Sequence, residues 1–299
     1  MNQFSTSACV LAFDDEREFA CELARSLNIS IEFVECHRFP DGELKLRLPP
    51  TLPERVFMLR SLPQPNEKLV ELLIAAPTAR ELGAHQLVLV CPYLAYMRQD
   101  IEFAPGEAVS QRHIAGLLAS RFDQIITIDP HLHRISSLQS VMPGCRAISL
   151  SAAASIGIWV SQQLDRALLL GPDEESAQWV REAARACDPM VDYGWCLKQR
   201  HGDHDVTVTL PPALKLQGRH VVLIDDLVST GRTIAAAARL ALAAGALSVD
   251  VAVTHALFVG DAQAQLKSVG IGHIWSTDCV PHESNVISVV PLLAKALRQ

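Results

Sequence analysis

The chain has 299 residues, of which 49% are hydrophobic, 20% charged and 5% aromatic, and this length predicts about two domains. A net charge of −7 without a basic block argues against nucleic acid as the main partner, and the few aromatic residues give no stacking platform for single strands. No apolar run reaches the roughly 18 residues that a membrane span needs, and no secretory signal is recognisable at the beginning of the sequence.

Apolar runs that fit buried strands alternate along the chain with amphipathic runs that fit helices. The expected strands are residues 9–13, 55–59, 86–91, 124–128, 167–170, 220–224 and 249–257. The expected helices are residues 15–26, 67–82, 110–121, 176–186, 234–244 and 261–269. This alternation predicts an α/β fold with mostly parallel sheets that helices cover on both faces.

The two halves of the chain carry a weak internal repeat. Residues 86–129 fit a strand, an Arg-Gln-Asp loop, a helix and a strand, and residues 219–259 repeat this order around an Asp-Asp loop. We therefore expect two similar doubly wound domains, residues 1–144 and 145–299, with ligands beyond the carboxyl ends of their strands.

The first polar motif, Phe39 to Glu43, lies between a strand-like run and an alternating Leu44, Leu46 and Leu48. Its Pro-Asp-Gly sequence is typical of turns, so the segment is predicted to be a β-hairpin.

The next motif follows the strand at 86–91 and finishes in Arg98-Gln99-Asp100. The planar Arg98 suits phosphate, and Gln99 and Asp100 can bind amino or hydroxyl groups, although a surface pair of Arg98 with Asp100 is an alternative.

Asp129, His131 and His133 follow the strand at 124–128. Histidines two residues apart lie on one side of an extended segment, and with Asp129 they could hold a transition metal.

The second half begins with two further polar segments. Asp173, in Pro172 to Ser176, fits either a ligand site or the N-terminal cap of the next helix. Lys198 and Arg200 end a strand-like run before a polar loop, and their spacing points both side chains one way in an extended chain.

The most informative motif follows the apolar run at 220–224. Asp225 and Asp226 precede a small loop, Ser229 to Thr233, and an Ala-rich helix. Loop amides and the positive end of a helix dipole form an anion site, while the two carboxylates suit sugar hydroxyls or a cation that accompanies phosphate. The motif predicts a site for a phosphorylated sugar, with an ordinary strand-to-helix turn as the alternative.

In this order the motifs resemble those of ribose-phosphate diphosphokinases, also called phosphoribosyl-diphosphate synthetases. The resemblance runs from about Phe39 to Thr233, and the departures from the family's usual residues, at Pro130, Glu175, Ser176, Ser229 and Arg232, indicate a divergent member. It implies two phosphoribosyltransferase-type domains, an ATP side in residues 1–144 with a β-hairpin flap and a ribose 5-phosphate side in residues 145–299.

The resemblance also implies roles for single residues. The residues assigned to ATP are Phe39, Asp41, Glu43, Arg98, Gln99, Asp100 and His131. The residues assigned to ribose 5-phosphate are Asp225, Asp226, Ser229, Thr230, Gly231 and Thr233. His131 and Asp173 are placed near Mg²⁺, and Lys198 and Arg200 near the charge that develops on the transferred group.

The expected reaction transfers the diphosphoryl group of Mg-ATP to the 1-hydroxyl of ribose 5-phosphate, giving 5-phosphoribosyl 1-diphosphate and AMP for nucleotide and amino-acid biosynthesis. No residue of the motifs is an obvious strong base, so positioning and charge neutralisation would carry catalysis. One alternative is a phosphoribosyltransferase, which would leave Arg98 and the hairpin unused. The other is a catalytically silent regulatory homologue, which would not need Lys198 and Arg200.

In the family the hairpin reaches a neighbouring subunit, which implies a homo-oligomer, a dimer or a hexamer, with shared sites. The eight cysteines form no C-x-x-C pair, so neither a disulfide framework nor a zinc cage is expected. The cysteines fit small apolar side chains that fill the core of a protein in the reducing cytoplasm. Neither nucleic acid nor a membrane is expected as a partner of the protein.

Overall fold

The computed structural model of the chain describes residues 8–132, 134–135, 137–200 and 206–299. Contacts divide it into two units, Met1–Leu150 with Val290–Gln299, and Ser151–Val289. This division falls after Leu150, whereas the sequence placed it after residue 144, and it returns the last helix of the chain to the first unit.

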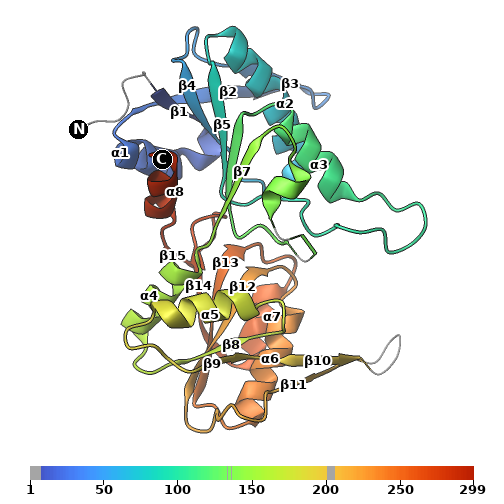
Figure 1. The fold of residues 1–299 in the computed structure, drawn as a ribbon, viewed down its shortest axis with the longest axis vertical. Coiled ribbons are helices and arrows are strands. Elements are labelled where there is room, and N and C mark those ends of the chain that lie inside the picture. Colours follow the sequence, from blue (N-terminus) through green and yellow to red (C-terminus); the bar gives the residue numbers. More distant parts are fainter. Residues whose placement is uncertain (1–7, 133, 136, 201–205) are drawn as a thin grey trace. The chain divides into compact units, whose positions relative to one another are not determined.

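The first unit holds a seven-stranded sheet in the order β3-β2-β1-β4-β5-β6-β7 (Figure 1). Its strands are β1 (Ala8–Phe13), β2 (Ser30–Arg38), β3 (Leu44–Arg47), β4 (Arg55–Leu59), β5 (Gln86–Cys91), β6 (Gln124–Ile128) and β7 (Arg146–Leu150). Neighbouring strands are parallel except β2 and β3, which form the antiparallel hairpin that the sequence predicted.

Helices cover both faces of this sheet. They are α1 (Arg17–Leu27), α2 (Pro65–Glu81), α3 (Ser110–Ala119) and α8 (Val290–Leu297), with short 3-10 turns at Asp14–Glu16 and Leu138–Val141. Alternate side chains of the apolar strands, such as Leu11, Met58 and Leu89, pack with α2 and α3 in one buried cluster. α8 packs beside α1, so the end of the chain completes the first unit.

The second unit holds a six-stranded parallel sheet in the order β15-β14-β13-β12-β8-β9 (Figure 1). Its strands are β8 (Leu168–Gly171), β9 (Tyr193–Trp195), β12 (His220–Val228), β13 (Ser248–Ala256), β14 (Ile271–Thr277) and β15 (Asn285–Ile287). A separate antiparallel hairpin consists of β10 (Leu197–Arg200) and β11 (Val206–Thr209).

Two helix pairs sandwich the second sheet. One face packs on α6 (Arg232–Ala243) and α7 (Ala262–Val269), and the other on α4 (Ala153–Gln163) and α5 (Ala177–Ala186). Successive residues of β12 alternate between the two clusters, which is why this strand is continuously apolar. The α/β class and the mostly parallel sheets are therefore confirmed.

β12 is longer than the sequence predicted. The expected strand ended at Ile224, but the parallel ladder with β13 continues from Asp225 opposite Val253 to Val228 opposite Ala256. The two acids are thus part of the strand rather than of the loop, because their backbones continue the hydrogen-bonded pairing that the apolar residues begin.

All eight cysteines lie in the described part of the chain, and none of them forms a disulfide. All are buried except Cys21 and Cys36, as expected for apolar fillers. Among the described helices, none has both the length and the apolar character that a membrane crossing requires.

Candidate active site

The Arg98-Gln99-Asp100 motif lies beyond the end of β5, and its three side chains differ in exposure. Arg98 is exposed, Gln99 is half-buried, and the side chain of Asp100 is only 1% exposed. Gln99 Nε2 donates to the carbonyl of Ile101 at 3.1 Å and to Glu107 at 3.4 Å, so it holds the loop that follows. Arg98 is therefore the residue of this motif that is most accessible to a ligand.

The neighbouring segment follows β6 and lies at the same edge of the sheet, because parallel strands end together. Asp129 has a positive φ of 38° and donates its backbone N–H to the carbonyl of Leu150 at 2.8 Å. His131 is half-buried, and Arg134 Nη1 donates to Asp100 Oδ1 at 2.7 Å. His133, which the sequence offered as a metal ligand, lies outside the described residues.

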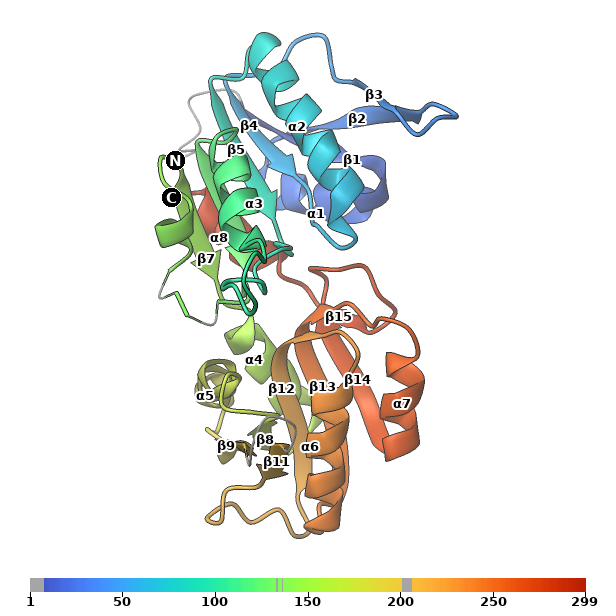
Figure 2. The ribbon, with the colours of Figure 1, turned by 90° about the vertical axis from the view of Figure 1, so that its right-hand side faces the viewer.

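The β2–β3 hairpin overhangs the sheet on its carboxyl side. β2 pairs with β1 only as far as Val34 opposite Phe13, and its later residues pair with β3 alone, so the hairpin projects beyond the sheet (Figure 2). Gly42 closes the turn with a φ of +97°, which favours glycine. The three predicted hairpin residues, Phe39, Asp41 and Glu43, are all exposed at its tip.

A buried charge cluster, which the sequence did not predict, lies where β1 and β4 end. Arg60 is only 3% exposed and forms ion pairs with Asp15, Glu71 and, at 3.5 Å, Glu16. Its guanidinium also lies 4.3 Å above the Phe13 ring. The sequence did contain a signal for this cluster, because the charged Arg60 directly follows the apolar strand β4.

In the second unit, β12 leads through Ser229 and Thr230 to α6. Gly231 precedes the helix with a φ of +72°, in the left-handed region that favours glycine. Thr230 and Thr233 are exposed and Ser229 is half-buried. The first N–H groups of a helix have no intrahelical acceptor, so this strand, loop and helix can bind an anion.

Asp225, Asp226 and Asp173 bring three carboxyl groups to the carboxyl ends of β8 and β12. Burial, followed by the negative charges of Asp226 and Asp173, raises the pKa of Asp225 well above its usual range. Asp226 is 2% exposed, and its backbone N–H donates to Asp225 Oδ1 at 3.0 Å. This edge of the sheet therefore favours ligands that donate hydrogen bonds or carry positive charge.

Asp173 forms a compact turn before α5. Its Oδ1 accepts the backbone N–H groups of Glu175 at 3.1 Å and Ser176 at 3.4 Å, and the Ser176 hydroxyl donates to the Asp173 carbonyl at 2.6 Å. Ser176 is fully buried, and a Cβ added at Gly171 would overlap its hydroxyl. The carboxylate thus serves the turn before α5, but Asp173 is not the N-cap of that helix, because the N-cap is Ser176 and it has no side-chain cap hydrogen bond.

The Lys198 and Arg200 backbones lie in β10, opposite Val208 and Val206 of β11. Their side chains, and the loop at 201–205, are outside what the structure describes. Within the described ranges, no three His, Cys, Asp or Glu side chains are grouped so that they could hold a metal ion.

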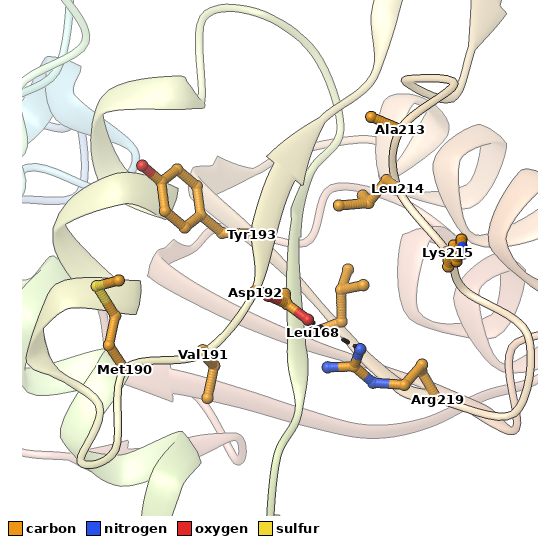
Figure 3. A pocket seen from close by; sticks show the side chains of 9 residues that line it. All are labelled: Leu168, Met190, Val191, Asp192, Tyr193, Ala213, Leu214, Lys215 and Arg219. Carbon is orange, nitrogen blue, oxygen red and sulfur yellow. Dashed lines mark hydrogen bonds and ion pairs between the residues drawn. The ribbon is translucent and has the colours of Figure 1, made fainter.

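A hollow of about 400 Å³ in the second unit opens at the opposite, amino edge of its sheet (Figure 3). It lies beside Leu168, Tyr193 and Arg219, where β8, β9 and β12 begin, and Arg219 pairs there with Asp192 at 3.0 Å. None of the predicted site residues line it. The predicted residues instead gather at the carboxyl edge of each sheet, apart from the hairpin residues and the β10 pair.

Comparisons with known proteins cover almost the whole chain. The family model for the N-terminal domain of ribose phosphate pyrophosphokinase matches residues 8–121, and the model for the phosphoribosyl transferase domain matches residues 149–293.

Relatives named ribose-phosphate pyrophosphokinase match almost the whole length of the chain. The protein of Methanopyrus kandleri is 36% identical over 96% of this chain and 98% of its own length. The protein of Methanosarcina acetivorans is 34% identical over 94% and 95%. The crystal structure of phosphoribosylpyrophosphate synthetase from Mycobacterium smegmatis has the same fold, with a TM-score of 0.83 at 24% identity and 98% coverage of both chains.

Proposed function

The chain belongs to the ribose-phosphate pyrophosphokinase family, and we propose that its two units bind the two substrates separately. It is a transferase of nucleotide biosynthesis that converts ATP and ribose 5-phosphate into 5-phosphoribosyl 1-diphosphate and AMP. The observation that carries the division of roles is the loop between β12 and α6, which joins an anion site to two carboxylates.

Ribose 5-phosphate binds, in our proposal, to the second unit. Ser229, Thr230, Gly231 and Thr233 surround the 5-phosphate at the start of α6, where loop amides and the helix dipole favour an anion. Asp225 and Asp226 accept hydrogen bonds from the ribose 2- and 3-hydroxyls. The raised pKa of Asp225 is consistent with this role, since hydrogen bonds from sugar hydroxyls would stabilise the carboxylate form, which burial and then the charges of Asp226 and Asp173 disfavour.

ATP binds to the first unit. Exposed Arg98 contacts the nucleotide, Gln99 positions the loop that it holds, and His131 lies beside the phosphates. Phe39, Asp41 and Glu43 bind adenine from the hairpin of a neighbouring subunit, because their exposed tip projects away from its own sheet. The active enzyme is accordingly a homo-oligomer, either a dimer or a hexamer.

Mg²⁺ is the metal that we assign to ATP. The second unit fits such an ion, because burial and then the negative charges of Asp226 and Asp173 raise the pKa of Asp225, and an added cation would offset both effects. Mg²⁺ usually binds one or two carboxylates together with phosphate oxygens and water, so a cage of three protein ligands is not required. Asp173 is the candidate ligand in the second unit and His131 the candidate in the first, each considered within its own unit, and a bound ion would neutralise phosphate charge.

The chemical step is an in-line attack by the ribose 1-hydroxyl on the β-phosphorus of ATP. The new O–P bond forms as the bond from the β-phosphorus to the α–β bridging oxygen breaks, AMP leaves, and the hydroxyl proton is released to solvent. Lys198 and Arg200 neutralise the charge that develops on the transferred group, so catalysis depends on positioning and electrostatics. We place the enzyme in the cytoplasm, where its eight free cysteines remain reduced.

The test is an analysis of nucleotide products after incubation with Mg-ATP, with and without ribose 5-phosphate. We expect AMP only when the sugar is present, with an equal amount of 5-phosphoribosyl 1-diphosphate. Formation of ADP would show transfer of a single phosphate and contradict the mechanism. Binding of both substrates without turnover would favour the regulatory homologue or the transferase.

A further inference from the structure

Asp100 is a buried carboxylate that, among the described residues, accepts a side-chain hydrogen bond from 34 residues further along the chain. Its side chain is 1% exposed, and its Oδ1 accepts Arg134 Nη1 at 2.7 Å. Its second oxygen, Oδ2, is buried and has no hydrogen-bond partner among the described residues. A carboxylate at this depth cannot contact ATP directly without a rearrangement of the loop.

Burial of this carboxylate is costly unless a cation pairs with it. The pair is therefore unlike a surface ion pair, which contributes between nothing and about 1 kcal/mol. Since the carboxylate is fixed by burial, the ion pair fixes the position of the Arg134 guanidinium.

In contrast to the buried Asp100, the side chain of Arg134 is 51% exposed. One terminal nitrogen is held by Asp100, and the planar guanidinium retains further N–H donors in a fixed geometry. A fork that is anchored on one side and open on the other is suited to bidentate binding of phosphate.

Arg134 also lies at the same edge of the sheet as Arg98. Arg134 follows β6 and Arg98 follows β5, and these strands are parallel neighbours, so both arginines emerge from the carboxyl edge of one sheet. His131 lies three residues before Arg134 in the same segment. An anionic ligand at this edge would thus meet two guanidinium groups rather than one.

We propose that Arg134 is a further phosphate-binding residue of the ATP side, and that Asp100 is a positioning residue that acts through Arg134. This inference rests on the proposed function, since it assumes that the first unit binds ATP. The Asp100 carboxylate fixes the guanidinium before ATP arrives, which lowers the entropy lost when the triphosphate binds.

The test is a double-mutant cycle with Arg134→Gln, Asp100→Asn and the combined variant. Binding of Mg²⁺ with α,β-methylene-ATP, which cannot undergo the cleavage, is measured by calorimetry, and kcat and KM are measured with ATP. Arg134→Gln should weaken analogue binding about ten- to hundredfold, as expected for loss of a charged hydrogen bond. Asp100→Asn should have a similar effect, and the double variant should be no weaker than Arg134→Gln.

A matched control is Arg121→Gln, which removes the same charge from an exposed residue just before β6 begins, at the amino edge of the sheet. Arg121→Gln should bind the analogue with the affinity of the wild type. All variants should bind ribose 5-phosphate with the affinity of the wild type. Arg134→Lys retains charge without the fork and should bind with intermediate affinity, which provides a test if Asp100→Asn folds poorly.

Wild-type affinity of Arg134→Gln for the analogue would overturn the proposal. Additive losses in the double variant would show that Asp100 acts independently of Arg134 and overturn its positioning role. Failure of the proposed function is distinguishable, because the wild-type protein would then form no AMP or would bind no analogue.

Discussion

At the scale of single residues, the buried cluster around Arg60 has an unbalanced charge. Arg60 and Lys68 contribute two positive charges, whereas Asp15, Glu16 and Glu71 contribute three carboxyl groups. Burial raises the pKa of Glu16 to about 7 against the attraction of Arg60 and Lys68. The cluster is therefore closest to neutrality when Glu16 carries a proton.

This imbalance predicts that stability falls with rising pH. The pKa of Glu16 is about 7 in the fold and near 4.5 in an unfolded chain, so the fold prefers the protonated form. The stabilisation is complete below pH 4.5 and is lost as the pH rises through 7. At about 1.4 kcal/mol per pKa unit, the loss is at most about 3.5 kcal/mol.

We expect Glu16→Gln to remove this part of the pH dependence, because its side-chain oxygen can still accept the Ser61 N–H. The measurement is the free energy of unfolding by denaturant at pH 5 and pH 8. Glu18→Gln, at an exposed position in the same turn, should follow the wild type. If the free energy of unfolding changes between pH 5 and pH 8 by the same amount in Glu16→Gln and the wild type, Glu16 is not the source of the pH dependence.

At the scale of elements, the apolar runs predicted the central strands because both faces of each sheet are buried. β4, β5 and β6 have the bounds that the sequence predicted. β12 was predicted too short, because a carboxylate ends an apolar run without ending the backbone pairing with β13. Polarity therefore marks the candidate residues on this strand but does not mark the end of the strand.

Most candidate residues lie at the carboxyl edges of the sheets, where the sequence predicted ligands to bind, but the motifs did not predict their individual contacts. Asp100 pairs with Arg134 through tertiary packing, and no sequence spacing indicates that bond. Asp173 accepts two amides of its own turn, a local bond of the kind that Asp favours, although the N-cap of α5 is Ser176. Local hydrogen bonds were thus within reach of the sequence, whereas pairs between separate loops were not.

The contact between α4 and α5 gives a prediction at this scale. A Cβ added at Gly157 of α4 would overlap the backbone of Ala183 in α5, so no side-chain movement can relieve the clash. Gly157→Ala should destabilise the protein by about 2 kcal/mol or more, as for overpacked cores.

Gly116 of α3 provides the matched control, because a Cβ there meets nothing within 4 Å. Gly116→Ala should stabilise by about 0.5–1 kcal/mol through the entropy of the unfolded chain. Thermal unfolding of both variants checks the pair. Equal effects of the two substitutions would show that α4 and α5 do not approach as described.

At the scale of the whole molecule, the two units are not simply consecutive along the chain. The second unit is inserted between Leu150 and Val290, and α8 returns to pack beside α1 in the first unit. Arg298 also donates to the carbonyl of Ser26 within this unit. A cut after Leu150 would therefore remove a helix from the first unit, so the complete chain is the appropriate material for every experiment above.

The sharing of sites between subunits gives the last prediction. Phe39 lies at an exposed hairpin tip, and Lys198 belongs to the proposed catalytic pair of the second unit. We expect Phe39→Ala to weaken ATP binding, and Lys198→Ala to lower kcat about 10²- to 10³-fold with little change in substrate affinity, because its role is in the transition state.

If the hairpin of one subunit completes the site of its neighbour, a mixed oligomer of these two variants contains some intact sites. A site that combines the hairpin of a Lys198→Ala subunit with the second unit of a Phe39→Ala subunit has both residues. Co-expression with two affinity tags should therefore yield oligomers with up to about a quarter of wild-type activity at saturating ribose 5-phosphate and low ATP, well above either variant alone. A double variant on one chain, co-expressed with itself, should remain inactive. Mixed oligomers no more active than the mean of the two parents would mean that each hairpin serves its own subunit.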